Sequence, residues 1–271
     1  MNYKKSYVPQ NGYTPLCKIG ECSLKDLEFG IIELTPGQAY TFDTQNKETA
    51  FVMLWGTASF SAKGNDYGKL GVRATVFASP KAECFYAGRN TKVDIVSVHN
   101  CKIAVCATPI EVDTEPQAIH QADVRVTRLG VKPWERDTSF IVDGSTNARK
   151  LTIGEAYCTP GNWAGFPPHK HDVDDMPREC VAEEVYYFLF DPQQGFGIQC
   201  LYTADGSIDE AYRVKNDELV EFPYGYHTTV SAPGYNTYFL WLMAGQHQGF
   251  CRVNDPDHAW VSAVENMVKK Q

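Results

Sequence analysis

The sequence has no long hydrophobic run and no excess of basic residues, and these absences exclude several classes of protein. Its longest apolar stretch, residues 238–244, is far shorter than the ~18 residues of a membrane span. The net charge is −8, from 25 Lys and Arg against 33 Asp and Glu, which argues against nucleic-acid and anionic-lipid partners. No apolar segment follows the basic pair at residues 4–5, so we expect no secretory signal and a cytoplasmic protein.

The sequence also lacks paired cysteine motifs. It contains nine cysteines, an odd number, and no Cys-x-x-Cys. Two pairs, Cys17 with Cys22 and Cys101 with Cys106, are each five residues apart, which matches no common zinc spacing. Several cysteines lie inside apolar runs. We therefore expect reduced, mostly buried thiols and no disulfide framework.

Helical periodicity is scarce, and most of the chain has the pattern of short strands. Apolar or alternating segments of four to eight residues are bounded by Gly, Pro, Asn or Asp, as at residues 50–55, 57–61, 92–98 and 238–243. Short strands at such spacing predict an all-β sandwich or barrel. Only residues 257–268 have helical spacing, with Trp260, Val261, Val264 and Val268 on one face.

The two halves of the chain have a similar layout of strands and turns, which predicts two tandem β-barrels. We place the first barrel at residues 1–113 and the second, with the C-terminal helix, at residues 149–271. Residues 114–148, a polar stretch with two prolines, are expected to form a linker and the first strands of the second half. One sheet could run through both barrels, and a single large sandwich is the alternative.

The most informative segment is Pro167-Pro-His-Lys-His-Asp172. Side chains two apart on a strand share a face, so His169 and His171 aim at one point. Twelve residues beyond His171, Glu183 and Glu184 open an aromatic strand, and His227 follows a Pro-Tyr-Gly-Tyr turn. Three imidazoles and one carboxylate suit a divalent transition metal with positions open to substrate.

This combination resembles the two conserved motifs of the cupin superfamily, in which three His and one Glu bind a metal inside a small barrel. The resemblance implies the ligands His169, His171, Glu184 and His227, and Glu184 is preferred over Glu183 because it directly precedes Val-Tyr-Tyr. The metal could be zinc, manganese, iron, nickel or cobalt. The first half has no His-x-His pair, and we expect its barrel to lack the metal site.

The second half resembles one family more closely, the 5-deoxy-glucuronate isomerases of myo-inositol degradation. The resemblance is carried by residues 161–172, 183–187, 192–196, 202–205, 224–227 and 255–260. It implies a bicupin, two double-stranded β-helix (jelly-roll) barrels with a short C-terminal helix. The implied reaction is the metal-dependent conversion of 5-deoxy-D-glucuronate to 5-dehydro-2-deoxy-D-gluconate, an aldose–ketose isomerisation. The chain departs from the family pattern at Phe188, Tyr224 and Thr228.

Further roles are assigned by chemistry and nearness in sequence. Glu183 and Tyr202 are candidate catalytic groups, although strand parity puts Glu183 on the face opposite Glu184. Arg149 and Arg178 are the preferred partners of a substrate carboxylate, ahead of Arg213 and Arg252.

Other functions are compatible with the same metal ligands. A cupin dioxygenase, an isomerase of another uronic acid and a non-catalytic cupin that senses a sugar are the alternatives. The expected partner is a small sugar acid, and a homo-oligomer is expected because exposed sheet edges need cover.

Overall fold

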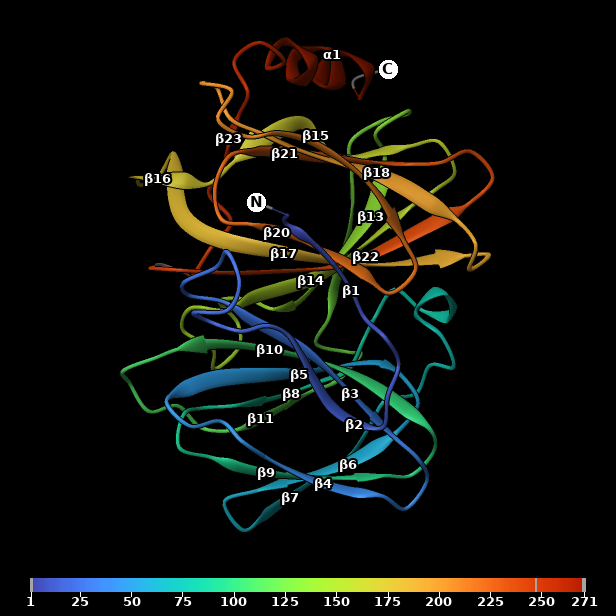
Figure 1. Ribbon diagram of the computed structural model, residues 1–271, viewed down its shortest axis with the longest axis vertical. Coiled ribbons are helices and arrows are strands. Elements are labelled where there is room, and N and C mark those ends of the chain that lie inside the picture. The colour runs from blue at the N-terminus through green and yellow to red at the C-terminus, as the bar shows by residue number, and fades with distance from the viewer. Residues whose placement is uncertain (1, 247, 270–271) are drawn as a thin grey trace.

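The computed structural model describes residues 2–246 and 248–269 and consists of two stacked β-barrels (Figure 1). In the N-terminal barrel a six-stranded sheet, in the order β11-β8-β5-β10-β3-β2, faces a four-stranded sheet, in the order β4-β9-β6-β7. A short 3₁₀ helix spans Val76–Ala78. The strands of this barrel are β2 (Gly12–Cys17), β3 (Glu28–Leu34), β4 (Ala39–Asp43), β5 (Lys47–Trp55), β6 (Ala58–Ala62), β7 (Asn65–Leu70), β8 (Cys84–Ala87), β9 (Lys92–Ser97), β10 (Cys101–Pro109) and β11 (Gln117–Ile119).

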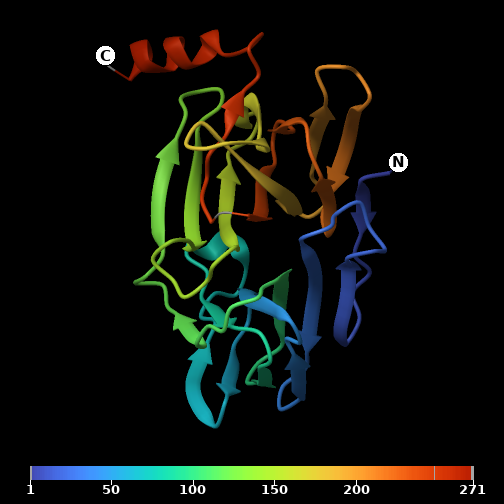
Figure 2. The same ribbon diagram turned by 90° about the vertical axis from the view of Figure 1, so that its left-hand side faces the viewer.

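In the C-terminal barrel the path β1-β20-β17-β22-β14-β13-β12, with β16 paired to β17, faces the five-stranded sheet β19-β18-β21-β15-β23. The helix α1 (Trp260–Val268) lies beyond the far end of this barrel (Figures 1 and 2). The strands are β1 (Lys4–Ser6), β12 (Arg125–Leu129), β13 (Arg136–Val142), β14 (Thr152–Cys158), β15 (Trp163–Lys170), β16 (Asp172–Asp175), β17 (Glu179–Asp191), β18 (Phe196–Tyr202), β19 (Asp209–Lys215), β20 (Glu218–Phe222), β21 (Tyr226–Ser231), β22 (Asn236–Gly245) and β23 (Val253–Asn254).

The prediction of an all-β bicupin with one C-terminal helix is confirmed. The N-terminal segment, however, crosses to the other barrel. The N-terminal strand β1 pairs with β20 and covers an edge of the second barrel. Strand β11, which follows the first barrel in sequence, pairs with β8 of that barrel. Apart from β1, each described sheet takes its strands from one half of the chain, so no continuous sheet runs through both barrels.

The core has three parts, one inside each barrel and one between the barrels. The cluster between them joins the outer faces of the two large sheets, where the rings of Phe29 and Tyr187 are 5.4 Å apart. Strand β17 alternates accordingly, with Tyr187 toward the other barrel and Tyr186 and Phe188 toward its own interior. Strands buried on both faces explain the continuous apolar runs in the sequence.

Polar contacts also hold the barrels together. The Glu48 carboxylate accepts hydrogen bonds from the backbone N–H groups of residues 149–151. Arg73 forms a fully buried ion pair with Glu155, whose carboxylate also accepts a hydrogen bond from the Tyr238 hydroxyl. Because each of these networks takes residues from both halves, the barrels are fixed against one another.

The C-terminal helix and the cysteines agree in part with what the sequence predicts. The expected helix begins at Trp260, but only Val261 of its apolar face is buried, and Trp260 is 65% exposed. All nine cysteines are free thiols, as expected, and six of them are buried. Within the described ranges, no helix combines the length and the apolar character needed to cross a membrane.

Candidate metal centre

The interior of the C-terminal barrel gathers the four predicted metal ligands from three strands. His169 lies on β15 and His171 directly follows it, Glu184 lies on β17, and His227 lies on β21. His169 and His227 are direct partners in the pairing of β15 with β21, and their ring centroids are 4.5 Å apart. All four side chains are buried, with exposed fractions of 4% or less.

Three of these residues form a tight cluster around one carboxylate. The ligand atoms of His171, Glu184 and His227 all lie within 4.8 Å of one another. Glu184 Oε2 is 2.9 Å from His171 Nε2 and 3.1 Å from His227 Nε2. The fourth residue, His169, turns its Nε2 toward Arg252, whose Nη1 donates to it at 3.3 Å.

Backbone carbonyls fix the orientation of all three imidazoles. His169 Nδ1 donates to Gly165 O at 3.2 Å, His171 Nδ1 to Ala182 O at 2.7 Å, and His227 Nδ1 to Gly225 O at 3.3 Å. Because a carbonyl can only accept, each Nδ1 carries the proton and each Nε2 faces the barrel interior. Metal-binding histidines are commonly oriented by this kind of contact.

Two glycines allow these contacts. Gly165 has φ +62°, and a Cβ atom there would lie 3.0 Å from Cε1 of His169. Gly225 has φ +97°, and a Cβ atom there would lie 2.8 Å from the carbonyl oxygen of Tyr202. Positive φ is costly for residues with a side chain, so the Gly of the Pro-x-Gly-x-His turn is needed to place His227.

Burial and the central carboxylate set the charges of the cluster. Burial lowers the pKa of His169 well below its ordinary value, and Arg252 lowers it further. Burial also lowers the pKa of His227. Burial acts in the same direction on His171, but the contact with Glu184 outweighs it and raises the pKa of His171. Burial opposes ionisation of Glu184, yet its hydrogen bond to His171 and its nearness to His227 hold its pKa below the ordinary value.

The donor set fits a divalent transition metal. His227 Nε2 is fully buried and has no directional hydrogen-bond partner among the described residues, despite its nearness to Glu184. A buried nitrogen without a partner is costly for the fold unless a ligand satisfies it. Metal binding requires neutral imidazoles and an ionised carboxylate. The lowered pKa values of His169, His227 and Glu184 favour these states, whereas His171 would give up its Nε2 proton to the metal.

The structure does not bring Glu183 to this cluster. Glu183 points out of the barrel, as parity predicts, and its carboxylate accepts hydrogen bonds from the backbone N–H groups of Lys25 and Asp26. The Tyr202 hydroxyl contacts none of the four candidate ligands in the described residues and instead donates to Asp255 Oδ2 at 2.6 Å. Burial and that hydrogen bond raise the pKa of Tyr202 well above its ordinary value.

The two arginines preferred from the sequence contact other parts of the protein and not the cluster. Arg149 is exposed and lies in the loop between β13 and β14, where its backbone N–H binds Glu48. The Arg178 side chain is 77% exposed and pairs with Asp175. The arginines that line the cavity beside Glu184 are instead Arg136 and Arg252. In the sequence, Arg252 ranks behind Arg149 and Arg178, and Arg136 is not a candidate, because nothing in the local pattern connects these positions to the histidines.

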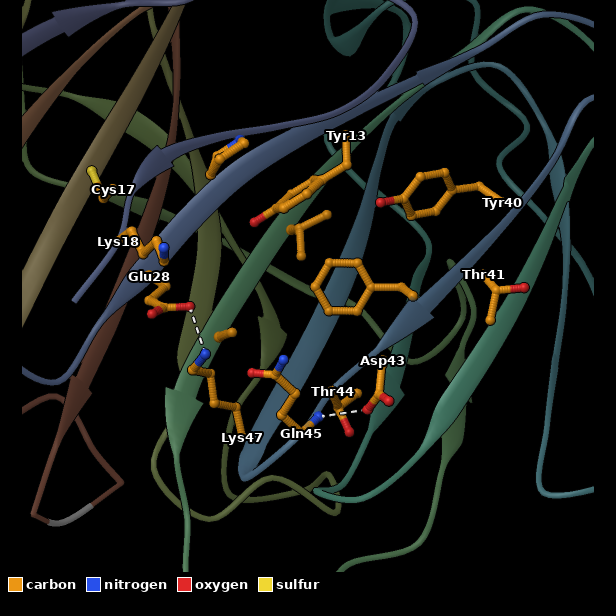
Figure 3. Close-up of a pocket in the computed structure, with 14 residues that line it drawn as sticks. Tyr13, Cys17, Lys18, Glu28, Tyr40, Thr41, Asp43, Thr44, Gln45 and Lys47 are labelled. Carbon is orange, nitrogen blue, oxygen red and sulfur yellow. Dashed lines mark hydrogen bonds and ion pairs between the residues drawn. The ribbon is translucent and has the colours of Figure 1, made fainter. Parts of the chain in front are cut away.

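The N-terminal barrel has a pocket of its own, with a different character. Strands β2, β3, β4 and β10 surround a cavity of about 290 Å³ (Figure 3). Its one close ion pair joins Lys47 to Glu28 at 3.0 Å, and tyrosines line the opposite side. None of the residues that line it is a histidine, so its donors do not resemble those of the C-terminal barrel.

Comparison of the sequence with protein families gives one match over almost the whole chain. Residues 3–261 match the KduI/IolB family. The 5-deoxy-glucuronate isomerase of Bacillus licheniformis is 34% identical over 245 residues, which cover 90% of each chain. That of Geobacillus kaustophilus is 36% identical over 243 residues, which cover 90% of this chain and 88% of the relative.

Solved structures agree at the level of the fold. An IolB-like protein from Salmonella typhimurium superimposes with a TM-score of 0.92 at 28% identity, covering 97% of this chain and all of the other. The oxalate decarboxylase of Lactobacillus farciminis, at 11% identity, has a TM-score of 0.71 over 100% of this chain and 93% of its own, which shows the shared fold alone. The chain therefore belongs to the KduI/IolB family, as the resemblance predicted, and is an isomerase with a bicupin fold.

Proposed function

We propose that this isomerase is metal-dependent and converts 5-deoxy-D-glucuronate to 5-dehydro-2-deoxy-D-gluconate, as the names of its relatives suggest. The observation that carries the proposal is the buried cluster of His171, Glu184 and His227, with His169 beside it. A divalent metal bound there would supply an electrophile for the oxygens at C1 and C2 of an aldose.

The protein's own residues would hold and shape that site. The three imidazoles are locked by their Nδ1 hydrogen bonds and aim Nε2 inward, and Glu184 contributes the single negative charge. The cavity beside the cluster is lined by aromatic rings, including Tyr186 and Trp241, which exclude water from the reacting atoms. Tyr186 and Thr138 are the hydroxyl-bearing residues among those that line it, and each can donate to a sugar oxygen.

A proton NMR time course with 5-deoxy-D-glucuronate in heavy water tests the proposal. We expect loss of the aldose signal with metal present and no turnover after chelation. Deuterium incorporation at C1 would indicate an enediol path, and its absence a hydride shift. Turnover that is insensitive to chelation would contradict the metal requirement. If the metal-bound protein does not turn over this compound, the proposed substrate is wrong and another uronic acid is favoured.

The dioxygenase alternative is tested by measuring oxygen consumption. Consumption of oxygen together with a small organic acid would support it. The expected homo-oligomer stays a prediction.

A further inference from the structure

Two arginines of the C-terminal barrel, one buried and one half-buried, have no counter-ion. Arg136 opens β13 and is 7% exposed, and Arg252 lies directly before β23. The Arg136 guanidinium donates one long hydrogen bond, to Trp134 O at 3.5 Å, and the Arg252 guanidinium donates to His169 Nε2. Among the described residues, neither forms an ion pair with a carboxylate.

This arrangement is unfavourable for the protein alone. Removing two like charges from water is costly unless each is paired and hydrogen-bonded. Elsewhere the same chain follows that rule, since the buried Arg73 pairs with Glu155. An anion from outside the chain would neutralise Arg136 and Arg252 in the same way.

The nearby acidic groups are already engaged. The Glu265 carboxylate of α1 binds Lys269 Nζ at 2.6 Å and the Trp134 indole N–H at 2.9 Å. The Glu184 carboxylate binds the imidazoles of the candidate metal centre. Neither carboxylate forms an ion pair with Arg136 or Arg252, although Glu265 lines the outer cavity and acts on both arginines from a longer distance.

The two arginines stand between two cavities. The inner cavity, about 30 Å³, is also lined by His169 and Glu184. The outer cavity, about 180 Å³, is also lined by residues of β23 and α1, the helix at the end of the barrel (Figure 1). An anion held by both guanidinium groups would therefore extend its other end toward the metal centre.

We propose that Arg136 and Arg252 form a carboxylate-binding subsite that selects a sugar acid over the corresponding neutral sugar. The planar guanidinium fork matches a carboxylate through paired hydrogen bonds. This inference rests on the proposed function, because it assigns the distal end of the same substrate. Arg149 and Arg178 line neither cavity, which leaves them outside this subsite.

The test compares the binding of D-glucuronate and D-glucose, which differ only at C6, to the metal-loaded protein by calorimetry. Hydrogen bonds to charged groups predict that the wild type prefers D-glucuronate by roughly 100-fold. Arg136→Gln should reduce that preference to about threefold or less, and the exposed Arg178→Gln should retain it. Arg136 is the cleaner position, because Arg252 also contacts His169.

Stability separates a binding role from a structural one. Removing an uncompensated buried charge should leave the midpoint of thermal unfolding of Arg136→Gln unchanged or higher than that of the wild type. A lower midpoint would overturn the inference, as would a wild type without preference or an Arg136→Gln variant that keeps it. Arg136→Lys, which keeps the charge but not the planar fork, provides a second test. We expect its preference to be about tenfold smaller than that of the wild type, and an unchanged preference would overturn the inference.

The binding test uses compounds other than the proposed substrate, so the two proposals fail separately. A preference that depends on Arg136 in a protein inactive on 5-deoxy-D-glucuronate would contradict the proposed function and support the subsite. Turnover of that substrate together with a preference independent of Arg136 would contradict only the subsite.

Discussion

Replacing Glu184 with Gln tests whether this carboxylate is a metal ligand. Its side chain is 1% exposed and lies between the Nε2 atoms of His171 and His227. Gln keeps the shape but removes the negative charge. One unit charge acting on another over ~4 Å, at an effective dielectric constant of ~20, contributes about 4 kcal/mol. A divalent ion carries two unit charges, so this energy is a lower bound, and at 1.4 kcal/mol per factor of ten metal binding should weaken by at least roughly 1000-fold.

The neighbouring Glu183 provides a matched control. It is adjacent in sequence, carries the same charge and lies on the opposite face of β17, where it accepts backbone hydrogen bonds from Lys25 and Asp26. Glu183→Gln should bind metal like the wild type and instead lose about 1–2 kcal/mol in the free energy of unfolding.

The assay is competition for metal with a chromophoric chelator, together with urea unfolding of the metal-free proteins. Equal loss of metal affinity in both variants would refute the assignment of Glu183 and Glu184 to opposite faces of β17. An unchanged affinity in Glu184→Gln would refute the ligand role of this carboxylate.

Three further substitutions or reactions test other parts of the structure. Gly165→Ala should weaken metal binding about tenfold, because the new methyl group would press against the His169 ring, and an unchanged dissociation constant would contradict this. Arg73→Met should lower the free energy of unfolding by about 3–5 kcal/mol in urea, because its carboxylate partner is left buried and unpaired; a loss below about 1 kcal/mol would show that the pair is unimportant. A hydrogen bond from Cys17 lowers the pKa of Cys22 to about 7, so alkylation of Cys22 by iodoacetamide, followed by peptide mass spectrometry, should accelerate as the pH rises through about 7 and level off above it. Acceleration that continues to pH 9 would contradict the lowered pKa.

The side-chain cluster of the candidate metal centre was predictable because its signal is local. The spacing of His169 and His171, the strand opened by Glu184 and the turn before His227 each determine a direction from a few neighbouring residues. Strand parity separated Glu183 from Glu184 correctly for the same reason.

The arginines of the proposed carboxylate subsite were not predictable in this way. Arg136 and Arg252 are far apart in the sequence and meet only because β13 and β23 contribute to one barrel. Arg149 and Arg178 are near the ligands in sequence, but a loop and a hairpin carry them to the surface. The strand β1 was also missed, because three residues are too few to show which edge they pair with.

The most direct test of the metal centre is an anomalous difference map from a crystal grown with manganese or zinc. We predict one strong peak inside the C-terminal barrel, between the Nε2 atoms of His169, His171 and His227 and the carboxylate of Glu184. Binding there would also require Arg252 to release His169 Nε2. A map without a peak at these four side chains, or with the only strong peak elsewhere, would contradict the assignment of this cluster as the metal centre.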